Sequence, residues 1–177
     1  MFSFFAAQNA KPFERQQRRM TTGLDAQRPG LIEWRSMPTE PKPTEGRFFN
    51  IAELASTLPD HAETMLTDIR LTDETAASCR IFRVHRPAPA HYHTSCDEYL
   101  YVLSGRAEIV IEGSEPRIIG PGELVYFRKN TVHAMPRILE EPYTVLAVDT
   151  PRRPPEDVHF VNPADGTAAS FIKTQSY

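Results

Sequence analysis

The stretch HYHTSCDEYLYVLSG at residues 91–105 is the most informative part of this sequence. His91 and His93 are two positions apart, and residues i and i+2 of a β-strand point to the same face. Two imidazoles on one face can reach a single metal ion. Glu98 follows His93 after five positions, and the small polar residues TSCD between them predict a bend that aims the Glu98 carboxylate back at the histidines.

A fourth candidate ligand is His133, which follows the turn Gly120-Pro121-Gly122 and one further apolar run. Three imidazoles and one carboxylate suit one divalent transition metal, such as Fe(II), Mn(II), Ni(II), Cu(II) or Zn(II), rather than Ca²⁺ or Mg²⁺. The set contains no thiolate, which argues against a structural zinc finger. Ligands that converge from several strands would leave one or two coordination positions open for water or substrate, as a catalytic metal needs.

The sequence around these residues predicts an all-β fold. Eight short runs rich in β-branched and aromatic residues lie between residues 65 and 150. Turn residues separate the runs, namely Gly105, Gly113, the Gly120-Pro121-Gly122 turn and Asn130. Many short strands with regular turns are typical of a sandwich or a closed barrel. No internal repeat is visible, so we expect one barrel.

These residues resemble the two sequence motifs of the cupin superfamily. The first motif is matched at the right spacings by His91, His93, Glu98 and Gly105, whereas His85 stands where the family has a leading glycine. The second motif is matched by Gly122 and His133, and three positions depart from it: Arg128 replaces a proline, Asn130 a glycine and Arg137 an asparagine. Asparagine tolerates the left-handed backbone that glycine would supply.

The cupin resemblance covers roughly residues 64–150. It implies a double-stranded β-helix, or jelly-roll, barrel in which one metal is ligated by His91, His93, Glu98 and His133. Cupins include dioxygenases, sugar isomerases and epimerases, decarboxylases, storage proteins and sugar-binding domains, and the fold alone does not choose among them.

Our leading expectation is an enzyme, an oxidoreductase of dioxygenase type that acts on a small organic substrate with Fe(II) as the favoured metal. Glu98 is the expected catalytic residue, because in some cupins this glutamate is proposed to leave the metal and act as a base. Two alternatives stay open. One is a non-redox isomerase, epimerase or lyase, and the other is a metal-containing sensor that binds a small molecule.

The residues after Glu98 predict the pocket wall. Leu100 and Val102 share the inward face with Glu98 and are expected to contact substrate, whereas Tyr99 and Tyr101 face outward. The outward tyrosines predict a contact with a second subunit or with the N-terminal extension. We therefore expect a homodimer.

Arginines provide a further candidate for substrate binding. Arg137 lies four positions after His133 and, if it points inward, could pair with a substrate carboxylate or phosphate. A solvated strand arginine is the alternative reading of that position. Arg80, Arg83 and Arg86 recur every three residues, which is not the period of a strand face, so we expect them to be solvated.

Four segments are expected along the chain. Residues 1–46 form a proline-broken N-terminal extension, whose apolar LIEW segment at 31–34 is expected to dock on the barrel or a second subunit. Residues 47–63 form a short helical lead-in, residues 64–150 the barrel, and residues 151–177 a tail that packs on the barrel. In the lead-in, Asn50 and Glu53 resemble an N-cap and its partner.

Composition excludes several classes of partner. The net charge of −3 among 177 residues lacks the basic excess of a nucleic-acid-binding protein. No apolar run approaches the ~20 residues of a membrane span, and the two cysteines, Cys79 and Cys96, form no CxxC pair. We therefore expect a cytoplasmic protein whose partner is a small molecule. Cys96 could serve as a soft ligand or a redox thiol, but a buried filler is the commoner role of such a residue.

Overall fold

The computed structural model describes residues 46–175, so the expected extension and its LIEW segment lie, up to residue 45, outside the described residues. Within the described range the helical elements are α1 (Ile51–Ser56), a 3-10 helix (Pro163–Asp165) and α2 (Ala168–Phe171). The strands are β1 (Leu66–Glu74), β2 (Ala77–Val84), β3 (Ala88–Tyr92), β4 (Asp97–Ile111), β5 (Arg117–Ile119), β6 (Leu124–Phe127), β7 (His133–Thr150), β8 (His159–Phe160) and β9 (Ile172–Gln175).

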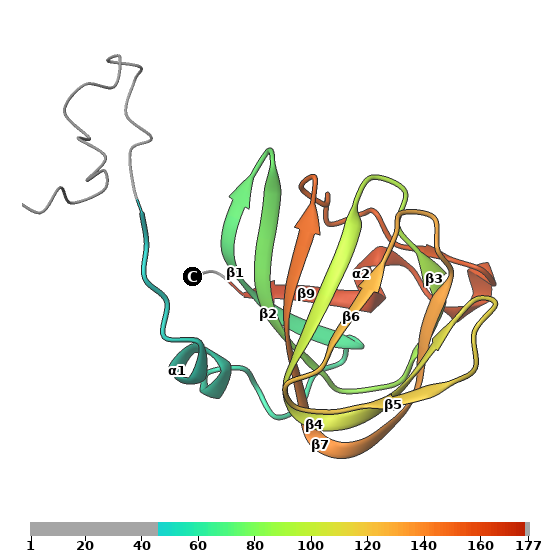
Figure 1. Cartoon of the computed structure of the whole chain (residues 1–177), viewed down its shortest axis with the longest axis horizontal. Coiled ribbons are helices and arrows are strands. Elements are labelled where there is room, and N and C mark those ends of the chain that lie inside the picture. The colour runs from blue at the N-terminus through green and yellow to red at the C-terminus, as the bar shows by residue number, and fades with distance from the viewer. Residues whose placement is uncertain (1–45, 176–177) are drawn as a thin grey trace, which may run out of the picture. The chain divides into compact units, whose positions relative to one another are not determined.

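The strands form one strongly curved sheet, which confirms the expected all-β barrel (Figure 1). Its main path runs β5-β4-β7-β2-β1-β9, while β6 pairs with β4, and β3 pairs with β7 and β8. The long strands β4 and β7 pair with each other. β4 also pairs with β6, and β7 also pairs with β3, so the sheet bends along these two strands. The first half of β7 therefore lies beside β3 and brings together two segments that are distant in the sequence.

Gly105 does not form the predicted turn, because β4 is one continuous strand that passes through it. The backbone φ of Gly105 is 74°, and a Cβ atom there would lie 2.4 Å from the carbonyl oxygen of Glu140 on β7. The close approach of the two strands requires a residue without a side chain, and the chain bends there without leaving the sheet. The left-handed conformation expected at Asn130 is confirmed by its φ of 66°.

Two apolar clusters stabilise the barrel. The inner cluster fills the barrel and contains Phe82, Val102 and Val145 among its members. The outer cluster lies between α1 and the sheet, where Leu58 and Ile81 are buried. Burial of such side chains contributes about 1.5–3 kcal/mol each.

The expected short helix is confirmed as α1, and its N-cap is Asn50, whose side chain accepts a hydrogen bond from the Glu53 amide. Arg83 holds the other end of the helix. Its Nη1 donates to the carbonyl of Leu58 at 2.8 Å and its Nη2 to that of Ala55 at 3.2 Å. Arg83 is therefore buried, and the prediction of a solvated side chain is wrong because this arginine satisfies the carbonyls where the helix ends.

The segment after Thr150 packs on the barrel. β9 pairs in parallel with β1, β8 pairs with β3, and α2 places Phe171 against the inner cluster. Residues 151–175 thus contribute to the wall around the inner cavity. Within residues 46–175, every helix is too short to cross a membrane.

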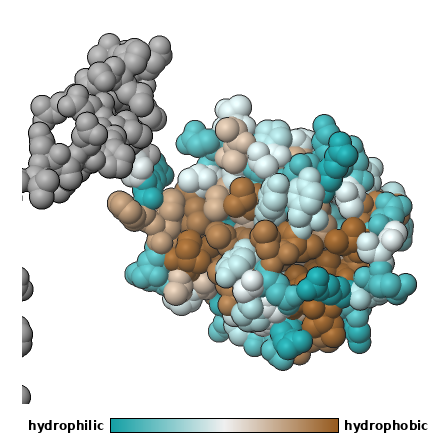
Figure 2. All heavy atoms as spheres, in the orientation of Figure 1, coloured by the Kyte–Doolittle hydropathy of each residue, from teal (hydrophilic) through white to brown (hydrophobic). Residues whose placement is uncertain are grey.

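Apolar side chains also reach the surface. Figure 2 shows them gathered in a band across the middle of the face turned to the viewer. Among the described residues, the exposed large apolar side chains include Tyr101 on β4 and Leu124 and Tyr126 on β6. Tyr101 and Leu124 are cross-strand neighbours, so they share one outward face of the sheet.

Candidate metal centre

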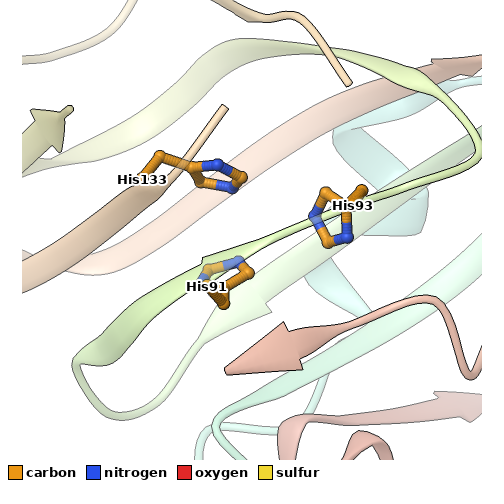
Figure 3. A group of neighbouring side chains, drawn as sticks. All are labelled: His91, His93 and His133. Atoms are coloured by element: carbon orange, nitrogen blue, oxygen red, sulfur yellow. The ribbon is translucent and has the colours of Figure 1, made fainter. Parts of the chain in front are cut away.

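Three buried histidines meet inside the barrel (Figure 3). His91 lies on β3 and His133 opens β7, where the two residues face each other across the strand pair. His93 follows the end of β3, in the bend predicted from the TSCD sequence. Ligand atoms of the three imidazoles all lie within 4.8 Å of one another. The strand β3, the residue that follows it and the start of β7 thus bring three imidazole nitrogens close enough to bind one metal ion.

The hydrogen bonds of these histidines define which nitrogen is free. Each Nδ1 lies close to a main-chain carbonyl, at 2.7 Å from Pro89, 2.5 Å from Asp157 and 3.0 Å from Thr131 for His91, His93 and His133 respectively. A carbonyl only accepts hydrogen bonds, so each Nδ1 carries the proton and each Nε2 keeps its lone pair. Nε2 of His133 is buried and has no hydrogen-bond partner. This is the arrangement of histidines that bind a metal through Nε2.

Two of the histidines, His91 and His133, are also held in the neutral form that a metal binds. Burial, with the neighbouring His133 and His93, holds the pKa of His91 well below its usual range. Burial likewise lowers the pKa of His133 to about 4. Neutral imidazoles are ready to bind a metal at neutral pH without first losing a proton.

Glu98 lies beside the three histidines at the start of β4. Its Oε2 is 3.5 Å from Nε2 of His93 and 3.6 Å from Nε2 of His133. Ligand atoms around a tetrahedral ion with bonds of about 2.1 Å lie roughly 3.4 Å apart, so Oε2 fits the same ion. Burial acts to raise the pKa of Glu98, but His93 and Arg80 outweigh it and hold that pKa well below its usual range.

Arg80 is buried next to Glu98, and the prediction that it is solvated is wrong. Its Nη2 lies 2.8 Å from Oε1 of Glu98 and its Nη1 lies 2.9 Å from Oδ2 of Asp149. Arg80 shares the inward face of β2 with Phe82 and Val84, because all three are spaced by two residues. The two-residue spacing of Arg80 from the apolar Phe82 and Val84 indicates that Arg80 points inward, whereas the three-residue spacing between the arginines does not bear on burial. Arg86 is exposed as expected.

Asp149 and Arg153 complete a buried group of charges that the sequence did not reveal. Both are buried, and Nε of Arg153 lies 3.5 Å from Oδ1 of Asp149. With Arg80 and Glu98 they make two positive and two negative charges, so the four largely compensate one another. The interior can hold these charges because each one faces an opposite partner.

A small cavity of about 30 Å³ adjoins the site. Its lining includes the three histidines, Glu98, Arg80 and Leu100, and Phe171 contributes an apolar wall from α2. A water molecule needs about 10–15 Å³ measured in this way, so the cavity holds roughly two. The cavity in this state is therefore smaller than any organic molecule of several heavy atoms.

Two of the three residues expected to bind substrate lie away from the cavity. Arg137 faces outward, with 61% of its side chain exposed, and pairs with Glu108 on the neighbouring strand. Val102 faces inward as expected but packs within the inner cluster instead of lining the cavity. Leu100 does line it. The outward turn of Arg137 follows from the register, which pairs it directly with Glu108.

Cys96 behaves as a filler of the interior. It is fully buried, and burial raises the pKa of its thiol to about 12. Its Sγ lies 3.9 Å from Oδ1 of Asp149. A protonated thiol is a poor metal ligand and a poor nucleophile, so this geometry favours a packing role.

Comparison with known proteins bears on the fold and the site. Residues 81–149 match the family described as "Cupin domain". The chain is 33% identical over 75 residues to dimethylsulfoniopropionate lyase DddQ of Ruegeria pomeroyi, which covers 40% of this chain and 36% of that protein. The chain thus spans about a third of the length of this curated relative.

Solved structures that resemble this chain include a candidate mannose-6-phosphate isomerase from Ralstonia eutropha JMP134. It is 24% identical with a TM-score of 0.50, and the match covers 61% of this chain and 98% of that one. A cupin family protein with a double-stranded β-helix fold from Methanocaldococcus jannaschii is 20% identical with a TM-score of 0.45, over 54% of this chain and 87% of that one.

Proposed function

Because this chain belongs to the cupin superfamily, we propose that it is a metal-dependent enzyme that performs a lyase-type elimination on a small organic substrate. The observation that carries the proposal is the convergence of three buried imidazoles whose Nδ1 atoms lie against main-chain carbonyls, which leaves their Nε2 atoms for a metal. His91, His93 and His133 would hold the metal, with Glu98 as the fourth group. When bound, a divalent ion supplies a Lewis acid that stabilises developing negative charge.

Glu98 is the residue that would move the proton. Among the described residues lining the cavity it is the only carboxylate, and its low pKa keeps it ionised at neutral pH. Arg80 holds Oε1 of Glu98, which leaves Oε2 as the atom that faces the histidines. The apolar wall formed by Leu100 and Phe171 would keep water away from the substrate.

Lyase chemistry is favoured over the dioxygenase expectation by the curated relative, whose name describes a lyase. Elimination needs a base and a group that stabilises negative charge, and Glu98 and a metal on the histidines would supply both. A dioxygenase is the second candidate. It is supported by the set of three histidines and one glutamate, which suits Fe(II) as well as Zn(II), Ni(II) or Mn(II).

Metal content tests the centre. We expect about one equivalent of a divalent transition metal in the purified wild type, measured by elemental mass spectrometry, and its loss in the double variant His91→Ala, His93→Ala. The matched control is His61→Ala, His85→Ala, which removes two histidines outside the cluster. Wild-type protein that neither contains metal nor takes up Fe(II), Mn(II), Ni(II) or Zn(II) on titration would refute the proposed centre.

Turnover of dimethylsulfoniopropionate separates the two reactions. In its elimination, the proton on the carbon next to the carboxylate passes to the base, the carbon–sulfur bond breaks, and dimethyl sulfide and acrylate form. We expect dimethyl sulfide release without oxygen uptake, and its loss in Glu98→Gln protein that still holds metal. Oxygen consumption on addition of this probe would favour the dioxygenase instead.

A homodimer is also part of the proposal. The outward face of β4 and β6 exposes 41% of Tyr101, 60% of Leu124 and 45% of Tyr126. Apolar groups gathered on one face are typical of an interface. We expect a dimer by light scattering after size exclusion, and a monomer for Leu124→Lys. A wild-type monomer at micromolar concentration would contradict this assignment.

A further inference from the structure

Asp157 lies beside the metal centre although it is outside residues 81–149, the part of the chain that matches the cupin family. It belongs to the segment between β7 and β8. Its side chain is buried, and both its carboxylate and its main-chain carbonyl contact the loop that carries His93.

The carboxylate of Asp157 holds the two residues that follow His93. Oδ1 accepts hydrogen bonds from the amide of Thr94 at 2.9 Å and from its hydroxyl at 2.8 Å, and Oδ2 accepts from the amide of Ser95 at 3.0 Å. The hydroxyl of Ser95 also donates to Oδ2. Burial acts to raise the pKa of Asp157, but these hydrogen bonds keep it well below its usual range. A buried carboxylate with this many donors fixes the backbone of the loop.

The carbonyl of Asp157 orients the ring of His93, since it lies 2.5 Å from Nδ1. Nη1 of Arg153 is also 3.4 Å from this nitrogen, but a guanidinium only donates, so the carbonyl is the partner of the Nδ1 proton.

The other two histidines are oriented locally, by the carbonyls of Pro89 and Thr131, each two residues earlier on the chain. The partner of His93 is 64 residues away. Of the three, His93 is therefore the histidine whose orientation depends on a distant segment.

We infer that Asp157 is a positioning residue of the metal centre, which holds the loop 93–95 in place and keeps Nε2 of His93 aimed at the metal. The inference rests on the proposed metal-dependent function. Partners that orient metal ligands in this way are worth about 10–100-fold in metal affinity. The segment after β7 thus belongs to the functional site as well as to the barrel wall.

The test uses full-length Asp157→Asn protein, with Asp165→Asn as the matched control in the same segment. An amide keeps the shape of the carboxylate but places an NH₂ group against N–H donors, so the loop loses half of its acceptors. The exposed carboxylate of Asp165 accepts a hydrogen bond from the side-chain amide of its neighbour Asn162.

We expect Asp157→Asn to weaken Co(II) binding about 10–100-fold and to change the visible absorption of the Co(II) centre. Asp165→Asn should match the wild type in both. Unfolding of the metal-free variants, followed by circular dichroism, shows that the fold persists. Equal Co(II) affinity and an identical spectrum in Asp157→Asn and wild type would overturn the inference.

A second readout does not need the metal. In the metal-free wild type, ¹⁵N spectra of the imidazoles should show His93 as the single Nδ1–H tautomer. Asp157→Asn should populate both tautomers for His93 and leave His91 and His133 unchanged, while His159, whose Nε2 lies 3.0 Å from Oδ1 of Asp157, reports the loss of the carboxylate itself. An unchanged His93 tautomer would overturn the positioning role. If the tautomer responds but the wild type binds no metal, the proposed function fails while the positioning of His93 by Asp157 stands.

Discussion

Arg80 and Glu98 form a buried ion pair inside the barrel, with Nη2 of Arg80 lying 2.8 Å from Oε1 of Glu98. Nη1 of the same guanidinium lies 2.9 Å from Oδ2 of Asp149. One arginine therefore compensates two carboxylates, and one of these belongs to the candidate metal centre. Removing the arginine would leave both carboxylates buried beside Arg153 alone.

Arg80→Met tests this ion pair. Loss of one partner of a buried pair costs about 3–5 kcal/mol, so we expect the free energy of unfolding in urea to fall by that amount. Arg117→Met removes an exposed pair with Glu123 and is the control, with an expected loss below about 1 kcal/mol. Equal losses in the two variants would show that the buried pair contributes no more stability than the exposed one.

Acid should destabilise the metal-free protein before the carboxylates titrate. Burial lowers the pKa of His133 from 6.5 to about 4 and lowers that of His91 as well. Below pH 6.5 the histidines of the unfolded chain take up protons that the same histidines of the folded protein do not. The free energy of unfolding therefore decreases as the pH is lowered. Each histidine contributes up to about 1.4 kcal/mol per pH unit.

The measurement is a series of urea unfolding curves between pH 7.5 and 5. His133→Gln removes one of the two groups, so its stability should depend less steeply on pH over the same range. A stability that stays constant in the wild type across this range would contradict the burial of neutral histidines.

Gly105→Ala should be strongly destabilising. The added Cβ would lie 2.4 Å from the carbonyl oxygen of Glu140, at a φ of 74°. Gly113→Ala is the matched control, because Gly113 has a similar φ of 77° but open space around it. We expect a loss of about 1–2 kcal/mol for the control from the backbone alone, and at least twice that for Gly105→Ala, measured by thermal unfolding.

Arg137→Ala should leave the site intact. The side chain is exposed and its ion pair with Glu108 lies on the outer surface, so the stability should change by less than about 1 kcal/mol. Metal affinity and any turnover should equal those of the wild type. A loss of substrate affinity in this variant would restore the substrate-binding role that its spacing from His133 suggested.

Local patterns in the sequence predicted much of the fold and the centre of the site. The His-x-His spacing, the polar bend before Glu98 and the return of His133 identified the four groups that the structure brings together. The alternation after Glu98 placed Leu100 and Val102 inward and Tyr101 outward, as observed. These features depend on neighbouring residues, because strand period and backbone preference act over a few positions.

Only the tertiary structure decided which distant groups complete the site. Arg80, Asp149, Arg153 and Asp157 come from β2, from the end of β7 and from the segment after it. The places of Arg80 and Asp149 arise from the register between strands, which pairs Arg80 with Ala147 and Glu98 with Asp149. Arg153 and Asp157 reach the site because the segment after β7 folds back beside His93. The same register turned Arg137 outward toward Glu108.

There is a physical reason why the sequence predicts the histidines and Glu98 but not the buried charges around them. Arg80, Glu98 and Asp149 can be buried because opposite charges meet across the sheet, and those meetings are settled when strands far apart in the sequence pair. The sequence alone predicted a barrel with His91, His93, Glu98 and His133 gathered inside it. The tertiary structure determined the buried charges that hold Glu98 and the distant carbonyl that orients His93, because both depend on contacts between strands and segments that are not neighbours in the chain.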